Sequence, residues 1–105
     1  MNSKVLSMLG LCRRAGAVII GTDLVTKALP SGKVKLVIYA GDSSANTEKK
    51  ITDKCKFYNT ECIKLSYGGG EIAHAIGKMS TVSAVGVTDE NFSRELVFRI
   101  SNETR

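Results

Sequence analysis

The stretch GTDLVTKA, residues 21–28, follows an apolar run and predicts the first turns of a helix that extends to about Leu29. Gly21 supplies a permissive turn, and we expect the Thr22 hydroxyl to cap the helix N-terminus. Since helical residues advance by about 100° each, this helix has one apolar and one polar side. The polar side combines short hydrogen-bonding groups and a cation with free backbone N–H groups, which suits phosphates and base edges. The polar residues are Thr22, Asp23, Thr26 and Lys27, and the apolar ones are Val25, Ala28 and Leu29. A surface helix without a ligand has the same pattern, so the rest of the chain decides.

Around this helix, short apolar runs alternate with amphipathic segments. Apolar residues spaced i, i+3, i+4 and i+7 predict a helix over residues 2–14, which Gly16 ends. The nearly continuous, β-branched run at 34–40 predicts a strand in the centre of the sheet. Further strands are predicted at 18–20, 62–65 and 82–87. One further helix begins after the N-cap Ser44 and ends at Asn59, a second follows a flexible loop at Gly68–Gly70, and a third begins at Asp89–Glu90. Alternating strands and helices predict an α/β domain with helices on both faces of a small sheet, whose strand order stays open.

The length of 105 residues and the 43% hydrophobic content are typical of one globular domain with one core, so we expect residues 1–105 to form a single domain. The sequence predicts neither a signal peptide nor a membrane span. Cys12, Cys55 and Cys62 are an odd number without CxxC spacing, which favours a reducing cytoplasm and disfavours a disulfide framework or a zinc site.

The net charge of +5 is unevenly distributed along the chain. Residues 1–56 hold ten basic and four acidic residues, a net charge of +6, whereas residues 57–105 have a net charge of −1. A basic half beside a nearly neutral half indicates a face that binds polyanions. A soluble basic protein without such a partner is the alternative.

The sequence offers no set of residues that predicts catalysis. The single histidine, His74, lacks an evident acid–nucleophile set, and the glycines at 68–70 lack the Lys-Ser/Thr ending of a P-loop. Asp42, Asp53 and Asp89 do not have the spacing of a calcium loop. We therefore expect no enzyme activity, no cofactor and no bound metal.

Short motifs occur along nearly the whole chain in a characteristic order. They are Arg14-Ala15-Gly16, Gly21-Thr22, Thr26-Lys27-Ala28, Lys35-Leu36-Val37-Ile38, Asn46-Thr47, Lys49-Lys50-Ile51 and Ile72-Ala73-His74-Ala75-Ile76-Gly77. In this order the chain resembles the kink-turn RNA-binding family of ribosomal proteins, the L-seven-Ae and L-thirty-e group with its short bacterial members. The last motif is similar to the family's L-G-x-A-x-G. The resemblance implies a three-layer α/β/α sandwich with a small mixed sheet.

Kink-turns are sharply bent RNA duplexes closed by tandem sheared G·A pairs. The resemblance implies that Gly21 and Thr22 face the RNA backbone. It also implies that Asp23 and Leu24 take the places of an Asn-Glu pair that reads guanine edges, with Lys27 in the place of the family's Lys. A second loop, which packs on a flipped-out base, would consist of Lys78, Met79, Ser80, Thr81 and Val82.

Two residues depart from the family pattern at the place where guanine is read. Ionised Asp23 only accepts hydrogen bonds, whereas Asn also donates, and Leu24 cannot accept at all. The family's basic residues before Gly-Thr are replaced by Ala17, Ile19 and Ile20. The sequence therefore predicts RNA binding with weakened recognition of a standard kink-turn.

Two functions from different classes follow. The first is a small cytoplasmic protein that binds ribosomal or regulatory RNA of kink-turn-like shape, with the ribosome as a further partner and no membrane. Its phosphate contacts would come from Arg14, Lys27, Lys33 and Lys35. The second is a protein–protein adaptor on the same fold with eroded RNA recognition. Its apolar contact patch would consist of Ile19, Ile20, Leu24 and Met79.

Overall fold

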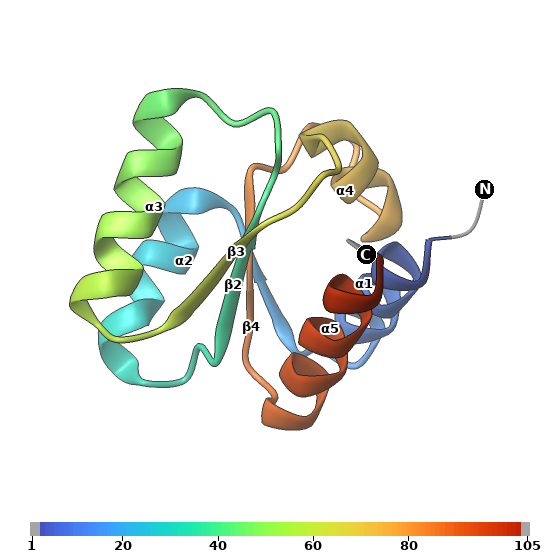
Figure 1. The fold of residues 1–105 in the computed structure, drawn as a ribbon, viewed down its shortest axis with the longest axis horizontal. Helices are drawn as coiled ribbons and strands as arrows, with labels where there is room; N and C mark the ends of the chain where they lie inside the picture. Colours follow the sequence, from blue (N-terminus) through green and yellow to red (C-terminus); the bar gives the residue numbers. More distant parts are fainter. Residues whose placement is uncertain (1–2, 104–105) are drawn as a thin grey trace.

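Residues 3–103 are described in a computed structural model, where one four-stranded sheet lies between two layers of helices (Figure 1). The elements are α1 (Lys4–Arg14), β1 (Val18–Ile20), α2 (Thr22–Ala28), the 3-10 turn η1 (Leu29–Ser31), β2 (Leu36–Tyr39), α3 (Ala45–Phe57), β3 (Glu61–Lys64), α4 (Gly69–Ala75), β4 (Ala84–Val87) and α5 (Glu90–Glu103). The strand order is β1-β4-β2-β3, with β2 parallel to β3 and β4 antiparallel to both of its neighbours. The predicted mixed α/β sandwich is confirmed, as is the central place of β2.

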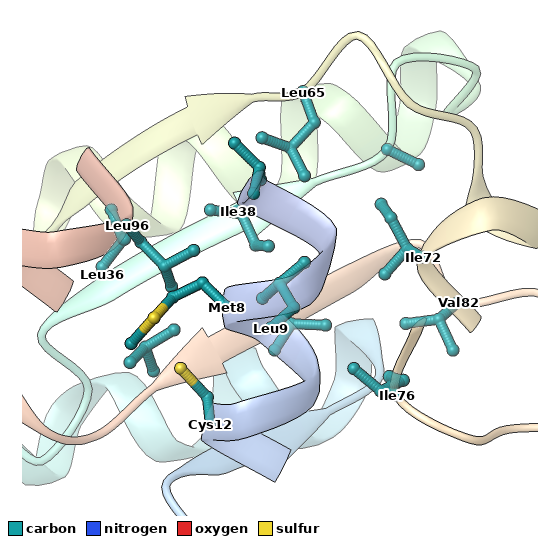
Figure 2. Packing of buried hydrophobic residues seen from close by; sticks show 14 of the residues in the cluster. Met8, Leu9, Cys12, Leu36, Ile38, Leu65, Ile72, Ile76, Val82 and Leu96 are labelled. Atoms are coloured by element: carbon teal, nitrogen blue, oxygen red, sulfur yellow. The ribbon is translucent and has the colours of Figure 1, made fainter. Parts of the chain in front are cut away.

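Strand β2 explains the three layers, because its side chains point alternately to the two faces of the sheet. Leu36 and Ile38 belong to a core cluster shared with α1, α4 and α5, part of which Figure 2 shows. Val37 and Tyr39 belong to a second cluster shared with α2 and α3. All four residues are buried, which is why the strand is apolar throughout.

The connection into α2 differs from the expectation that Thr22 caps the helix. Gly21 is the N-cap, with φ of +106°, and Thr22 is the first helical residue. The Gly21 N–H donates to the Ala84 carbonyl at 2.9 Å, so the residue that leaves β1 still pairs with the start of β4. A side chain is strained at this φ, and the glycine rather than the hydroxyl therefore makes the turn.

The glycine run at 68–70 was predicted to be a flexible loop, and this prediction is wrong for Gly69 and Gly70. Both lie in the first turn of α4. The Asp42 carboxylate accepts from the Gly69 N–H at 3.0 Å, and Glu71 accepts from the Gly68 N–H at 3.1 Å. These acceptors satisfy N–H groups that a helix leaves unpaired at its start, so glycines become helical here.

The other element boundaries shift by one or two residues. The strands predicted at 34–40, 62–65 and 82–87 span 36–39, 61–64 and 84–87, and the first helix begins at Lys4. Residue 2, where that helix was expected to begin, lies outside the described residues. Gly16 follows α1 with φ of +72°, as the predicted helix stop requires.

The cysteines are free thiols packed in the two cores. Cys12 and Cys55 are buried and Cys62 is half-buried. Burial raises the pKa of the Cys12 thiol to about 11, which keeps it protonated and unreactive. A hydrogen bond with Cys55, together with burial, raises the pKa of Cys62. Over residues 3–103, no helix is both long and apolar enough to cross a bilayer.

Candidate nucleic-acid interface

Three segments meet at one end of the sheet, at the top of Figure 1. They are the start of α2, the β2–α3 loop (residues 40–44) and the α4–β4 loop (residues 76–83). The Gly21 N–H donates to Ala84, and the Ala40 N–H donates to the Ser83 carbonyl at 2.8 Å. Residues from three distant parts of the sequence are thereby fixed around the first residue of β4.

Helix α2 presents a charged and an apolar side chain side by side at this end. Asp23 and Lys27 are exposed, and Leu24 is 58% exposed. Val25 is fully buried in the second core cluster and holds the helix on the sheet. The predicted orientation of the helix is therefore confirmed, with Leu24 on the solvent side.

Thr26 is less available to a ligand than its place on the polar side suggested. Its hydroxyl lies 3.0 Å from the carbonyl oxygens of both Thr22 and Asp23. The hydroxyl proton is thus donated within the helix, and only the oxygen lone pairs face outward.

The α4–β4 loop projects four of the five residues predicted for the second loop into solvent, whereas the fifth, Val82, is buried. Lys78, Met79, Ser80 and Thr81 are all exposed. The loop is anchored at both ends, because the Lys78 N–H donates to Ala73 at 2.8 Å and the Val82 N–H donates to Gly69 at 3.1 Å. The Met79 side chain is fully exposed, so an apolar group stands at the tip of this anchored loop.

Asp42 links the β2–α3 loop to this arrangement. Its carboxylate accepts from Gly69 N–H at 3.0 Å, and a Cβ built at Gly68 would lie 2.8 Å from the same carboxylate. Asp42 therefore packs tightly against the start of α4. It acts by positioning α4 and the loop that follows it.

Lys50 of α3 joins the site, although the sequence reasoning assigned it no role. Its ammonium group lies 3.1 Å from the Asp23 carboxylate. The negative charge of Asp23, at the position that the family resemblance assigns to guanine reading, is therefore paired with a cation 27 residues away in sequence. The motif Lys49-Lys50-Ile51 supported the family resemblance, but nothing in the local pattern indicates the partner of Lys50.

The first turns of α3 are held by a buried hydroxyl. The Tyr39 hydroxyl donates to Glu48 at 2.9 Å, and Lys64 lies 3.5 Å from the same carboxylate. Burial, and then the hydrogen bond to Glu48, raise the pKa of Tyr39 to about 12, so its proton remains available for this bond. The position of Lys50 is therefore set by a fixed helix.

Two of the predicted phosphate-binding residues, Lys33 and Lys35, lie apart from this end of the sheet. Lys35 donates its backbone N–H to Val87, the last residue of β4, and its ammonium group lies 3.1 Å from the Gly32 carbonyl. Lys33, two residues before Lys35, is also exposed, at the end of the sheet opposite to the candidate interface. Arg14 lies beside α4 in a groove of about 440 Å³ that His74 also lines. The structure thus brings together Gly21–Lys27 and Lys78–Thr81, without Lys33 and Lys35.

Chemically, the assembled end offers cations, a carboxylate, backbone groups and two exposed apolar side chains. Such a mixture can contact phosphates, base edges and unstacked bases at once. Among residues 3–103, no group of three or more His, Cys, Asp or Glu side chains is arranged to hold a metal ion.

Known proteins resemble this chain in sequence and in fold. The RNA-binding protein YlxQ of Bacillus subtilis is 40% identical over 90 residues, 86% of this chain and 88% of that protein. The large ribosomal subunit protein eL30 of Sulfolobus acidocaldarius is 33% identical over 85 residues, 81% of this chain and 82% of that protein. These relatives are named for RNA binding or for the ribosome and not for catalysis.

Solved structures with the same fold include a protein of unknown function from Bacillus halodurans C. It superposes with a TM-score of 0.87 at 39% identity, covering 95% of this chain and 99% of that one. The 15.5kD RNA binding protein of Giardia lamblia shares the fold, with a TM-score of 0.75 at 17% identity over 97% of this chain and 92% of that one. The sequence matches the family described as "Ribosomal protein L7Ae/L30e/S12e/Gadd45 family" over residues 3–97, and the chain belongs to that family.

Proposed function

We propose that residues 1–105 act as a single cytoplasmic RNA-binding domain that recognises a kink-turn or a similarly bent RNA. One observation carries the proposal: Gly21–Lys27 and the exposed loop Lys78–Thr81 converge around the first residue of β4. The names of the relatives, RNA-binding and ribosomal proteins, support RNA as the ligand class. A ribosomal or a regulatory RNA fits this class equally.

The chemistry favours a bent RNA over a regular duplex. An A-form helix hides its base edges in a deep major groove, whereas a bend exposes edges and splays bases out. Lys27 and the Lys50–Asp23 pair face a ligand at α2, and Met79 offers an apolar surface for an unstacked base. The polar groups at α2 therefore suit the exposed base edges of a bent RNA, and Met79 suits a base that is splayed out of the stack.

The test compares a kink-turn RNA with a control in which the sheared G·A pairs are replaced by Watson–Crick pairs. We expect the kink-turn to bind more tightly at the same salt concentration. Because phosphates are neutralised, the logarithm of the affinity should fall with the logarithm of salt by about 0.7–0.9 per phosphate contact. Equal affinity for both RNAs, or affinity independent of salt, contradicts the proposal.

The exposure of Leu24 and Met79 also supports the alternative, a protein–protein adaptor. Ile19 and Ile20, the other two residues of the expected patch, are half-buried and pack against the core clusters. Two isolated apolar side chains make a smaller patch than the sequence suggested. Weak binding to every RNA tested, with an intact fold, favours the adaptor.

A further inference from the structure

Helix α3 ends in an exposed aromatic ring with a defined orientation. The Phe57 side chain is 79% exposed. Its ring packs edge-to-face on Tyr58, with ring centroids 4.8 Å apart and an interplanar angle of 84°. Tyr58 itself packs against the second core cluster, so it supports the Phe57 ring from the side of the protein. A supported ring that faces water offers a flat π surface to a ligand.

The ring lies in a hollow with lysines along one side of the helix. The hollow has a volume of about 560 Å³ and is lined by Lys50, Asp53, Lys54, Phe57 and Tyr58. This size is within the range of small-ligand sites. The Asp53 carboxylate is paired with Lys49 at 2.8 Å, which reduces its repulsion of an anion. Lys54 is exposed, one turn before Phe57.

The hollow begins at Lys50, whose pair with Asp23 connects it to α2, and extends along α3 to Phe57. Helices α2 and α3 lie side by side on the same face of the sheet (Figure 1). The contact between Asp23 and Lys50 joins the two helices, and one turn further along each helix come Lys27 and Lys54. Lys50 and Lys54 of α3 therefore lead from the contact with α2 toward Phe57.

We propose that this hollow binds an unpaired nucleotide of the RNA that α2 holds, with its base stacked on Phe57 and its phosphates near Lys54 and Lys50. Basic tracks with interspersed aromatic rings are the general solution for single-stranded nucleic acid, since every base has a π face. The inference rests on RNA being the ligand at α2. An acidic peptide would use the lysines but would gain little from the open ring.

The test uses the full chain and two matched pairs of variants. Phe57→Ala removes the ring, and Phe98→Ala removes another exposed phenylalanine, 62% exposed, from α5 on the opposite layer. Lys54→Gln removes a cation that lines the hollow, and Lys56→Gln removes an exposed cation of α3 that does not line it. Melting temperatures check that all four variants fold.

Three RNA probes separate this inference from the proposed function. They are a minimal kink-turn, the same kink-turn with an unpaired extension, and a single-stranded oligoadenylate of about eight nucleotides. We expect Phe57→Ala to weaken binding of the extended and single-stranded RNAs by about fivefold to a hundredfold, and to leave the minimal kink-turn unaffected. Lys54→Gln should weaken binding of the same two RNAs by a smaller factor. The two control variants, Phe98→Ala and Lys56→Gln, should bind the RNAs as the wild type does.

Each outcome is decisive. If Phe57→Ala and Phe98→Ala bind the extended and single-stranded RNAs alike, the inference is overturned. It is also overturned if Phe57→Ala weakens binding of an oligoglutamate peptide but does not weaken binding of RNA. If the wild type fails to prefer the kink-turn over its control but single-stranded binding still depends on Phe57, the proposed function fails and the hollow stands as an RNA site.

Discussion

Helices α3 and α5 have similar lengths and lie on opposite faces of the sheet, but they use their charges differently. In α5, Glu90 pairs with Arg94 at 2.7 Å and Glu95 pairs with Arg99 at 2.8 Å, both at i, i+4 spacing. Arg99 also donates to the Lys4 carbonyl at 2.9 Å. Both arginines of α5 are therefore paired within the helix, and Arg99 also connects it to α1.

In α3, whose residues are all described, three of the four lysines form no ion pair within their own helix. Only one i, i+4 pair, Lys49 with Asp53, is present within the described part of this helix, while Lys50 pairs with Asp23 of α2. Lys54 and Lys56 are exposed and form no ion pair with any of residues 3–103. The comparison shows one outer helix whose basic residues are paired with its own acidic residues and another that leaves exposed lysines unpaired among residues 3–103.

The largest expected effect concerns the packing of α5 against the hydrophobic core. Leu96 is fully buried, so Leu96→Ala should cost about 2–5 kcal/mol of stability. The measurement is the free energy of unfolding in urea. Phe98→Ala, at an exposed position of the same helix, should stay within about 0.5 kcal/mol of wild type. Equal losses in the two variants would show that α5 does not pack against the core as described.

Next in size is the effect of restoring the family pattern on α2. Asp23→Asn with Leu24→Glu should tighten binding to a standard kink-turn, since a good bidentate base contact contributes about 1–3 kcal/mol of discrimination. The double change keeps the net charge. Lys27→Ala should weaken binding in either background. The comparison is made at one salt concentration with melting temperatures as control, and a wild type that binds as tightly as the restored variant contradicts the assignment of these residues.

A smaller effect tests whether α3 supplies charge to α2. Lys50→Gln should weaken kink-turn binding a few-fold, because the Asp23 carboxylate then faces RNA without its partner at 3.1 Å. Exposed pairs contribute about 0.2–1 kcal/mol, which sets this scale. In the Asp23→Asn background the effect of Lys50→Gln should shrink. An equal loss in both backgrounds would mean that Lys50 acts independently of Asp23.

The smallest effect concerns the attachment of α5 to α1. Hydrogen bonds, chiefly from the Tyr67 hydroxyl and then from Ser3, lower the pKa of the Glu103 carboxyl below its ordinary value of 4.5. A carboxyl whose folded pKa is lowered stabilises the fold above its unfolded pKa, and this contribution disappears as the pH falls through the folded value.

Glu103→Gln should therefore lower the melting temperature slightly at pH 7. The difference from wild type should shrink as the pH falls from 7 through the lowered pKa of the wild-type carboxyl, which then also becomes protonated. A difference that stays constant over this range would exclude a role for the Glu103 charge.

Local pattern was sufficient to predict the elements of the fold, because each helix and strand has its own periodicity and its own stop signal. The helix stop at Gly16 and the N-cap at Ser44 are examples, and the Ser44 side chain accepts from the Thr47 N–H at 3.2 Å. The same reasoning failed at Gly69 and Gly70, since the Asp42 acceptor that favours helix there lies 27 residues from Gly69.

The site was predictable in part for the same reason. Resemblance selected α2 and the loop 78–81, and the structure places them at one end of the sheet. It could not show that Lys35 lies at the other end, because that depends on the antiparallel pairing of β2 with β4. Lys50 and Phe57 were missed because the roles proposed for them depend on how α3 packs beside α2.

The most direct test of the account is a map of the RNA contacts on the protein. Backbone amide chemical shifts are recorded for the isotope-labelled chain during titration with a kink-turn RNA that carries an unpaired extension. The account predicts that the largest changes fall on Gly21–Lys27, Lys78–Thr81 and the face of α3 that includes Lys50 and Phe57. Changes concentrated on α5, or on Lys33 and Lys35 at the opposite end of the sheet, would contradict it.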